Sequence, residues 1–285
     1  MRISVRVLSA LLFAAASPAV LSAQFQEPTS DELKMTSDPK APGASAVYLY
    51  REERTDDLIH FHSYYARIKV LTEKGKELAT VQIPYEKGKF QVAAIQGRTI
   101  HPDGTVIPLT TKPSDLLDFK SAGHQFNQMV FTLPSVEVGS ILEYRLQLRY
   151  SEDNIYPPDW FVQQPYFVHK AHYVFIPDFN HGHVVTNSRG EVLDGLMYSM
   201  RLGPSDQVVR DTQNRYSLDV TDVPALPDDD WMPPLNTIQY AVHFYYTSAN
   251  NGPEYWDKES RFWAKNAEHF AAPSGSIKGA ASGIV

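Results

Sequence analysis

A strict two-residue alternation at residues 142–150 constrains this chain more than any other feature. Apolar side chains alternate there with charged and amide side chains, and the apolar set is Leu142, Tyr144, Leu146, Leu148 and Tyr150. Successive side chains of a β-strand point to opposite faces, so this pattern predicts a strand with one apolar face. We expect Tyr144 and Leu146 to be core residues of a central strand.

Other segments have the same strand-like character. Residues 64–70 and 79–83 alternate around the polar stretch 73–76, which predicts a hairpin between them. Further strands are expected at 47–50, 91–100, 105–109, 129–133, 140–150, 168–176 and 240–246, with weaker ones near Val184, near Tyr198 and at 216–220. Residues 114–127 are polar and weakly periodic, which predicts a loop with a short helix. Many short strands joined by Gly and Pro turns favour an all-β, two-sheet sandwich.

The first 23 residues have the features of an export signal. Arg2 and Arg6 precede an apolar run at residues 7–16, and small residues lead up to Ala23. The apolar run is shorter than the ~20 residues that a membrane span needs, which favours a cleaved signal peptide, residues 1–23, over an anchor. We therefore predict an exported protein, periplasmic or extracellular, that starts near Gln24.

The rest of the chain divides into three parts. Residues 24–46 are rich in Pro, Ser, Asp and Lys and predict a flexible lead-in. Residues 47–246 form the expected β-sandwich domain, which includes a Pro-rich strap at residues 223–235. Residues 247–285 contain a predicted amphipathic helix from Pro253 to Phe270. Its apolar stripe, which we expect to be incompletely buried, consists of Trp256, Trp263, Ala267 and Phe270.

The composition excludes several classes of function. The chain has no cysteine, so it has neither a disulfide nor a thiol nucleophile. Its formal net charge of −7, without a basic cluster interleaved with aromatics, argues against a nucleic-acid partner. After the signal, no stretch is apolar enough to predict a membrane span.

Candidate metal and catalytic residues are few. His181 and His183, with Asp178 nearby, are the best metal candidates, but a site needs three or four converging ligands. His60 and His62 have the same spacing and the same weakness. The acidic run 228–230 lacks the alternating ligands, the glycine and the closing glutamate of a calcium loop. No serine elbow, phosphate loop or dinucleotide motif occurs. We therefore predict no catalytic residue, no metal and no cofactor.

Two tryptophans are the candidate ligand-binding residues. Trp160 and Trp231 lie beside prolines in turn-like segments, where aromatic side chains can form a platform for a glycan or a peptide. The alternative, which we favour, is that they plug the ends of the sandwich, since tryptophan is large and usually mostly buried.

Four segments together resemble one known family. They are IKVLTEKGKELATVQIP (68–84), RTIHPDGTVIPL (98–109), LPSVEVGSILEY (133–144) and VPALPDDDWMPP (223–234). They resemble the uncharacterised β-rich domain, domain of unknown function 3857, that precedes a transglutaminase-like domain in exported bacterial proteins. The resemblance covers roughly residues 47–246 and implies an immunoglobulin-like β-sandwich with no assigned catalytic residue.

The C-terminal segment resembles the run-in to the transglutaminase-like core. The Cys-His-Asp triad of that core lies beyond this sequence, so we expect no acyl-transfer or peptidase activity from this chain. The leading hypothesis is a non-catalytic module that docks onto, or presents substrate to, a transglutaminase-like domain. The alternatives are a free-standing glycan- or peptide-binding module and a hydrolase that uses carboxylates or a metal.

Overall fold

The computed structural model describes residues 25–121, 123–151, 154–178, 192–203, 207–227 and 229–272, single residues at 186, 190, 275, 279 and 282, and only the backbone of residue 236. Its helices are α1 (Ser30–Lys34), α2 (Leu235–Ile238) and α3 (Gly252–Ala271), with a 3-10 helix η1 at Glu73–Ala79. The strands are β1 (Ala46–Asp56), β2 (Phe61–Val70), β3 (Thr80–Lys87), β4 (Phe90–Ile100), β5 (Val106–Pro108), β6 (Ser114–Ser121), β7 (His124–Thr132), β8 (Ile141–Tyr150), β9 (Asp159–Phe161), β10 (Val168–Ile176), β11 (Gly195–Arg201), β12 (Val209–Arg210), β13 (Tyr216–Val223) and β14 (Ala241–Thr247).

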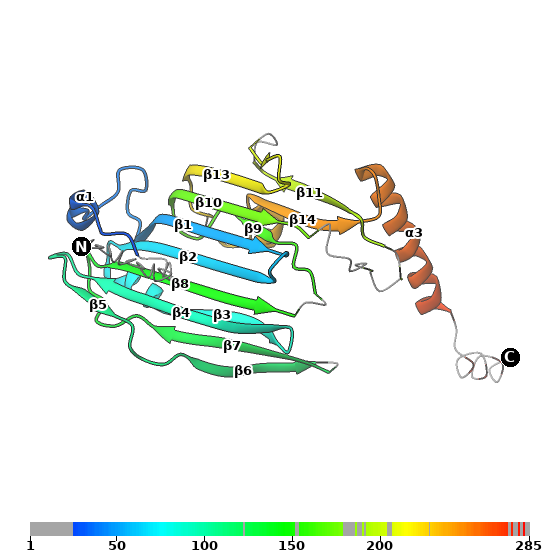
Figure 1. The fold of residues 1–285 in the computed structure, drawn as a ribbon, viewed down its shortest axis with the longest axis horizontal. Helices are drawn as coiled ribbons and strands as arrows, with labels where there is room; N and C mark the ends of the chain where they lie inside the picture. Colours follow the sequence, from blue (N-terminus) through cyan, green and yellow to red (C-terminus); the bar gives the residue numbers. More distant parts are fainter. Residues whose placement is uncertain are drawn as a thin grey trace, which may run out of the picture.

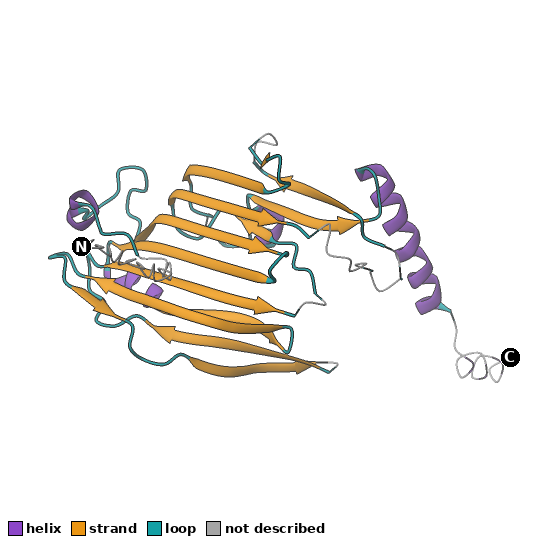
Figure 2. Ribbon diagram, viewed as in Figure 1, coloured by secondary structure: helices purple, strands orange, loops and turns teal. Residues whose placement is uncertain are grey.

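These strands form one large open sheet and one small sheet (Figure 1). The large sheet has eleven strands in the order β12-β13-β10-β1-β2-β8-β4-β3-β7-β6, with β5 paired to β4. The small sheet has the order β11-β14-β9. Figure 2 shows that strands make up the body and that the one long helix lies at an end. The β-rich class and the C-terminal helix are confirmed. The immunoglobulin-like sandwich is not confirmed, because most strands belong to a single open sheet.

The core lies on one face of the large sheet. As the alternation predicts, the apolar set of β8 is buried, including Tyr144 and Leu146, and β8 pairs with β2 on one side and β4 on the other. The small sheet packs on this face beside β10: the ring of Phe244 lies 5.1 Å from that of Phe175 in β10 and 5.4 Å from that of Tyr216 in β13. The two sheets therefore share one core over part of the large sheet.

Two predictions about local structure are wrong. Residues 64–70 and 79–83 do not form a hairpin, because η1 leads the chain away and β3 pairs with β7, whereas β2 pairs with β1 and β8. At Gly75 a Cβ atom would lie 2.2 Å from the carbonyl oxygen of Ser45, so only glycine fits this close crossing.

The expected loop at residues 114–127 is instead the edge hairpin β6–β7. Every residue of β6 is exposed, so no apolar face imposes an alternation on its sequence. The backbone ladder to β7 and the stacking of Phe119 on Phe126, with ring centroids 4.6 Å apart, hold it in place.

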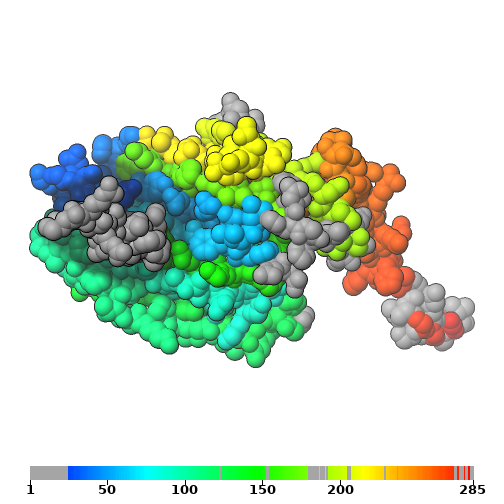
Figure 3. Space-filling view, in the orientation of Figure 1, coloured from blue at the N-terminus to red at the C-terminus, as the bar shows by residue number. Residues whose placement is uncertain are grey.

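Residues 25–45 lie against the second face of the large sheet, unlike the flexible lead-in that the sequence predicts. Thr29 and Glu32 form a reciprocal capping box at the start of α1. Leu33 and Met35 then pack against a small apolar cluster that includes Val47 and Ile141. Figure 3 shows this N-terminal segment, in dark blue, at one end of the molecule and α3, in orange, at the other.

The remaining chain passes through the Pro-rich strap to the C-terminal helix. After β13, the described residues of the strap form no strand. The strap is held to the segment after β9 by a hydrogen bond from the amide of Leu226 to the carbonyl oxygen of Gln164. α3 starts at a capping Asn251, whose side chain accepts from the amide of Glu254 at 3.0 Å. No helix in the described part of the chain has both the length and the apolarity for crossing a membrane.

Candidate functional site

A groove of roughly 610 Å³ lies on the apolar face of the large sheet, and we call it the central groove. Its floor comes from the neighbouring strands β1, β2 and β8, and residues 81–84 of β3 line it as well. One wall comes from the segment that leads into and out of β9. Strand register puts polar side chains on this floor, because Glu53 of β1 faces Tyr64 of β2, which in turn faces Leu146 of β8. The polar and aromatic lining residues are Arg51, Glu53, His62, Tyr64, Tyr144, Tyr156, Asp159, Phe161, Gln164 and Gln239.

Arg51 is a fixed part of the groove floor. Its Nε donates to the Tyr64 hydroxyl at 3.0 Å, and its Nη1 donates to the Tyr173 hydroxyl at 3.0 Å and to the Phe161 carbonyl oxygen at 3.2 Å. The guanidinium also lies 5.3 Å from the ring centroids of Tyr48 and Tyr64. Since these contacts engage the guanidinium and leave it buried, Arg51 acts as a structural cation rather than as an open binding group.

The groove shifts the pKa of one carboxyl group, that of Glu53, and of one imidazole, that of His62. Burial raises the pKa of Glu53 to about 7; the charge of Arg51 opposes this rise, and that of Asp159 adds to it. Burial lowers the pKa of His62 to about 4. The groove therefore offers a carboxyl group that can gain or lose a proton near neutral pH, beside a neutral imidazole.

The histidine does not form part of a nucleophile–base pair open to a ligand. Its Nδ1 lies 2.9 Å from the Oγ1 of Thr55, but Thr55 is completely buried. A hydroxyl nucleophile must reach the reacting atom of a substrate, and the Thr55 hydroxyl has no access to the groove. The described arrangement is suited to binding.

The two tryptophan candidates lie in different environments. Trp160 is completely buried, with its ring centroid 5.5 Å from that of Tyr173, and it packs behind the groove wall that its neighbours Asp159 and Phe161 form. Trp231 is fully exposed on the strap, with a φ of 68° that non-glycine residues seldom adopt. The structure therefore does not bring the two indoles together into one platform. Trp160 belongs to the core, and Trp231 is open to solvent.

The metal candidates gain no further ligands where the structure describes them. His181, His183 and Asp228 lie outside the described residues. His60 contacts the carbonyl oxygen of Asn154, and His62 contacts Thr55. Within the described ranges, no group of three or more His, Asp or Glu side chains is placed to hold a metal ion.

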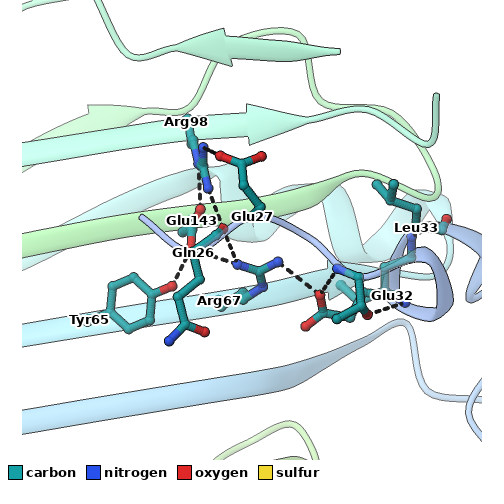
Figure 4. Close-up of polar contacts among 10 residues, drawn as sticks. Gln26, Glu27, Glu32, Leu33, Tyr65, Arg67, Arg98 and Glu143 are labelled. Atoms are coloured by element: carbon teal, nitrogen blue, oxygen red, sulfur yellow. Dashed lines mark hydrogen bonds and ion pairs between the residues drawn. The ribbon is translucent and has the colours of Figure 1, made fainter. Parts of the chain in front are cut away.

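A buried polar cluster on the opposite face is the main feature that the sequence did not predict (Figure 4). Glu143, in the polar register of β8, is fully buried and accepts from Arg67 Nη1 at 3.0 Å, from Arg98 Nε at 2.5 Å and from the Tyr65 hydroxyl. The same two arginines donate to the carbonyl oxygen of Gln26, at 2.8 and 2.6 Å.

This cluster fastens the N-terminal segment to the sheet. Arg67 Nη2 pairs with Glu32 at 2.9 Å, and Lys69 Nζ donates to the carbonyl oxygens of Leu33, at 3.0 Å, and Gly139, at 2.5 Å. Burial lowers the pKa of Lys69 to about 8. Because these charges are engaged by partners within the chain, we assign the cluster a structural role. The sequence alone does not indicate this cluster. Arg67 and Arg98 become recognisable as partners of Glu143 when the strand register is known, because both pair with it across the sheet.

α3 carries an exposed aromatic stripe, which we define as Trp256, Trp263 and Phe270. Their exposed fractions are 68%, 65% and 92%. The expectation of incomplete burial is confirmed. Single exposed apolar residues are ordinary, but three large aromatics on one helix at seven-residue spacing form a patch that soluble monomers seldom leave in water.

Comparison with known proteins gives a family and a shared fold. A family model described as a domain of unknown function with solved structure, DUF3857, matches residues 61–227. No curated protein matches the chain. A solved structure named a "putative protease", from Parabacteroides distasonis, is similar over 72% of this chain and 41% of its own, with 13% identity and a TM-score of 0.58. At this identity the similarity shows the fold alone.

Two structures of leukotriene A4 hydrolase from Saccharomyces cerevisiae are more distant. They cover 73% and 79% of this chain and 30% and 34% of their own, at 10% and 9% identity, and both have a TM-score of 0.31. These values are too low to support a structural conclusion. The chain spans less than half the length of each of the three solved chains.

Proposed function

The chain belongs to the DUF3857 family, and from that membership we propose that its β-rich domain is a non-catalytic module that docks onto, or presents substrate to, a transglutaminase-like domain. We propose further that the protein is exported to the periplasm or the cell exterior. In this proposal the aromatic stripe of α3 is the docking surface, and the central groove is the place where substrate is held. The immunoglobulin-like description of the fold also remains a proposal that rests on the family resemblance.

The exposure of the aromatic stripe is the observation that carries the docking role. Trp256 and Trp263 are the residue type most often found at the energetic centres of protein interfaces. α3 follows directly after β14 and extends from the end of the sheet (Figure 1), which is where a following domain would meet it. The solved chain from P. distasonis is more than twice as long as the part that matches, so this fold occurs there beside further protein.

The contacts of the groove residues support a role in recognition. The chain has no cysteine, Arg51 is occupied by tyrosines, and Thr55 is buried behind His62. What the groove does offer is aromatic rings and the carboxyl groups of Glu53 and Asp159, which suit recognition.

A binding assay tests the docking role. The purified chain is titrated with a separately produced transglutaminase-like domain from a family member, and binding is measured by calorimetry. Replacing both Trp256 and Trp263 by alanine should weaken binding by about tenfold or more. Trp231→Ala removes an even more exposed tryptophan from the strap and should leave binding unchanged. Absence of saturable binding by the unmodified chain, or equal binding by all three proteins, would refute docking through α3.

A free-standing glycan- or peptide-binding module is the second candidate. It is favoured by the rings of Tyr64, Tyr156 and Phe161 along the groove, which replace the platform of Trp160 and Trp231 that the sequence predicts. Saturable binding on glycan or peptide arrays by the chain alone, without a partner domain, would support this candidate.

A further inference from the structure

Glu53 is a polar group that the central groove leaves without a partner. Arg51 is held by tyrosine hydroxyls, His62 contacts Thr55, and Asp159 pairs with His243 at 2.7 Å. By contrast, the Glu53 carboxyl group has no hydrogen bond or ion pair with any residue that the structure describes. It is half-buried on the groove floor.

A half-buried carboxylate without a partner raises the free energy of the folded protein, and a bound cation would offset this penalty. Taking a charged group out of water without a partner is unfavourable, and an opposite charge at hydrogen-bond distance offsets part of the penalty. Arg51 is close enough to influence Glu53, but no ion pair joins the two, and Nε and Nη1 of Arg51 donate to Tyr64, Tyr173 and Phe161. A ligand cation therefore has no competitor for the carboxylate within the groove.

The walls of the groove favour the same kind of ligand. The rings of Tyr156 and Phe161 line the space around Glu53, and aromatic faces attract ammonium and guanidinium groups. Apolar side chains of Val81, Ile83 and Leu148 continue the lining and suit the aliphatic stem of a lysine or an arginine. The carboxylate of Asp159 adds a second negative charge on the wall.

We propose that the central groove binds a basic peptide, with a lysine or arginine side chain paired to Glu53 between the rings of Tyr156 and Phe161. This inference rests on the proposed role of the groove in holding substrate and is independent of docking through α3. A groove of roughly 610 Å³ is large enough for one long side chain and part of the backbone beside it.

Proton release is a signature of this pairing. Since burial raises the pKa of Glu53 to about 7, a cation that binds the carboxylate must displace a proton at or below neutral pH, and affinity should rise between about pH 6 and about pH 8. The groups that face Glu53 are Arg51 from β1, His62 and Tyr64 from β2, Tyr156 and Asp159 from the wall, and Tyr173 from β10. His62, with its pKa lowered to about 4, stays neutral over this range, and burial raises the pKa of Tyr156 to about 12.

Calorimetric titration with a matched pair of peptides tests the proposal. The probe is a short peptide, capped at both ends, with one central lysine, and its control has norleucine at that position. The lysine peptide should bind the unmodified chain at least about tenfold more tightly than the norleucine peptide. Glu53→Gln should reduce that affinity by about tenfold or more and abolish its rise with pH.

Two further variants control for charge and folding. Glu52→Gln removes an equal charge from the opposite face of β1 and should leave binding unchanged, which separates pairing at Glu53 from general attraction to an acidic protein. Phe161→Ala removes an exposed wall ring and should weaken binding without any change at Glu53.

Equal binding of both peptides, or equal binding by the unmodified chain and Glu53→Gln, would overturn the proposal. So would saturable binding of a neutral oligosaccharide that is insensitive to Glu53→Gln. The docking assay with Trp256 and Trp263 variants does not involve the groove floor. If the chain docks through α3 but does not distinguish the two peptides, only the inference about the groove is refuted. If it distinguishes the peptides but does not dock, only docking through α3 is refuted.

Discussion

Glu143 stands between Arg67 and Arg98 on the two neighbouring strands and is completely buried with both of them as partners. Glu143→Ala should therefore destabilise the fold by about 3–5 kcal/mol, because it leaves two buried guanidinium groups without their carboxylate. Urea unfolding measures the loss. Glu27→Ala is the control: Glu27 is well exposed and 3.7 Å from Arg98, so its removal should cost at most about 1 kcal/mol. Similar losses for both variants would show that burial of the Glu143 charge is unimportant.

Leu146 tests the apolar face of the same strand. Leu146→Ala should lower the free energy of unfolding by about 2–5 kcal/mol, the range for truncation of a large buried side chain. Arg149→Ala changes an exposed residue on the other face of β8 and should change it by no more than about 0.5 kcal/mol. Chemical denaturation of both variants gives the comparison, and a small loss for Leu146→Ala would mean that this strand is misplaced.

Glu53 makes stability depend on pH with a definite sign. Its pKa is raised from 4.5 to about 7 by burial, so the folded chain binds more protons than the unfolded chain within this window, and the contribution of Glu53 to stability falls as pH rises through it. Glu53→Gln should stabilise the fold by about 1–3 kcal/mol above pH 7 and have little effect near pH 4. His62 acts in the opposite direction: its pKa is lowered from 6.5 to about 4, so the stability associated with it is lost as pH falls through that range.

The difference in unfolding free energy between Glu53→Gln and the unmodified chain, measured from about pH 4 to about pH 8, isolates Glu53 from His62. A difference that does not change with pH would show that the Glu53 carboxyl group is well solvated in the folded protein.

At the scale of elements, the sequence pattern predicts strands well where one face is buried. The alternation in β8 is visible because Leu142 to Tyr150 must supply apolar side chains to the core at every second position. The sequence of β6 shows no such alternation, because an exposed edge strand has no such requirement. Periodicity also does not indicate which strands pair with β2 and β3. That pairing depends on the direction in which η1 leads the chain between them.

The central groove could not be predicted from local sequence patterns either. Glu53, Tyr156 and Phe161 are far apart in the sequence, and nothing in their local spacing indicates that they line one groove. Burial of Glu143 was equally hidden, because a charged residue in the polar register normally faces water. The N-terminal segment, which contributes Gln26 and Glu32, covers that face and makes it part of the interior.

α3 should make the isolated chain associate with itself. No residue that the structure describes buries its aromatic stripe, so at high concentration the stripe of one molecule should meet that of another. Removal of residues 252–285 should improve solubility, and light scattering should then report a monomer. A monomeric full chain, combined with loss of stability after trimming, would show that α3 belongs to the β-rich domain.

At the scale of the whole molecule, export should produce a mature chain that starts near Gln24. Cleavage after Ala23 leaves the contacts of the N-terminal segment in place, because Phe25 lies 5.0 Å from the guanidinium of Arg98 and Gln26 binds both arginines of the buried cluster. Mass spectrometry of the protein recovered from its natural host gives the start directly. An intact Met1 on folded cytoplasmic protein would contradict export.

The parallel pairing of β1 with β10 also decides when this protein can finish folding. Tyr48 pairs with Val168, about 120 residues later in the chain, and β10 then joins β13, which is later still. Contacts between such distant segments close large loops before they gain any stabilisation, which makes folding slow. During synthesis β1 and β2 therefore emerge long before β10 and keep one unpaired edge until it arrives. An unpaired edge is open to other strands, so a factor that shields nascent chains would favour correct folding of this open sheet.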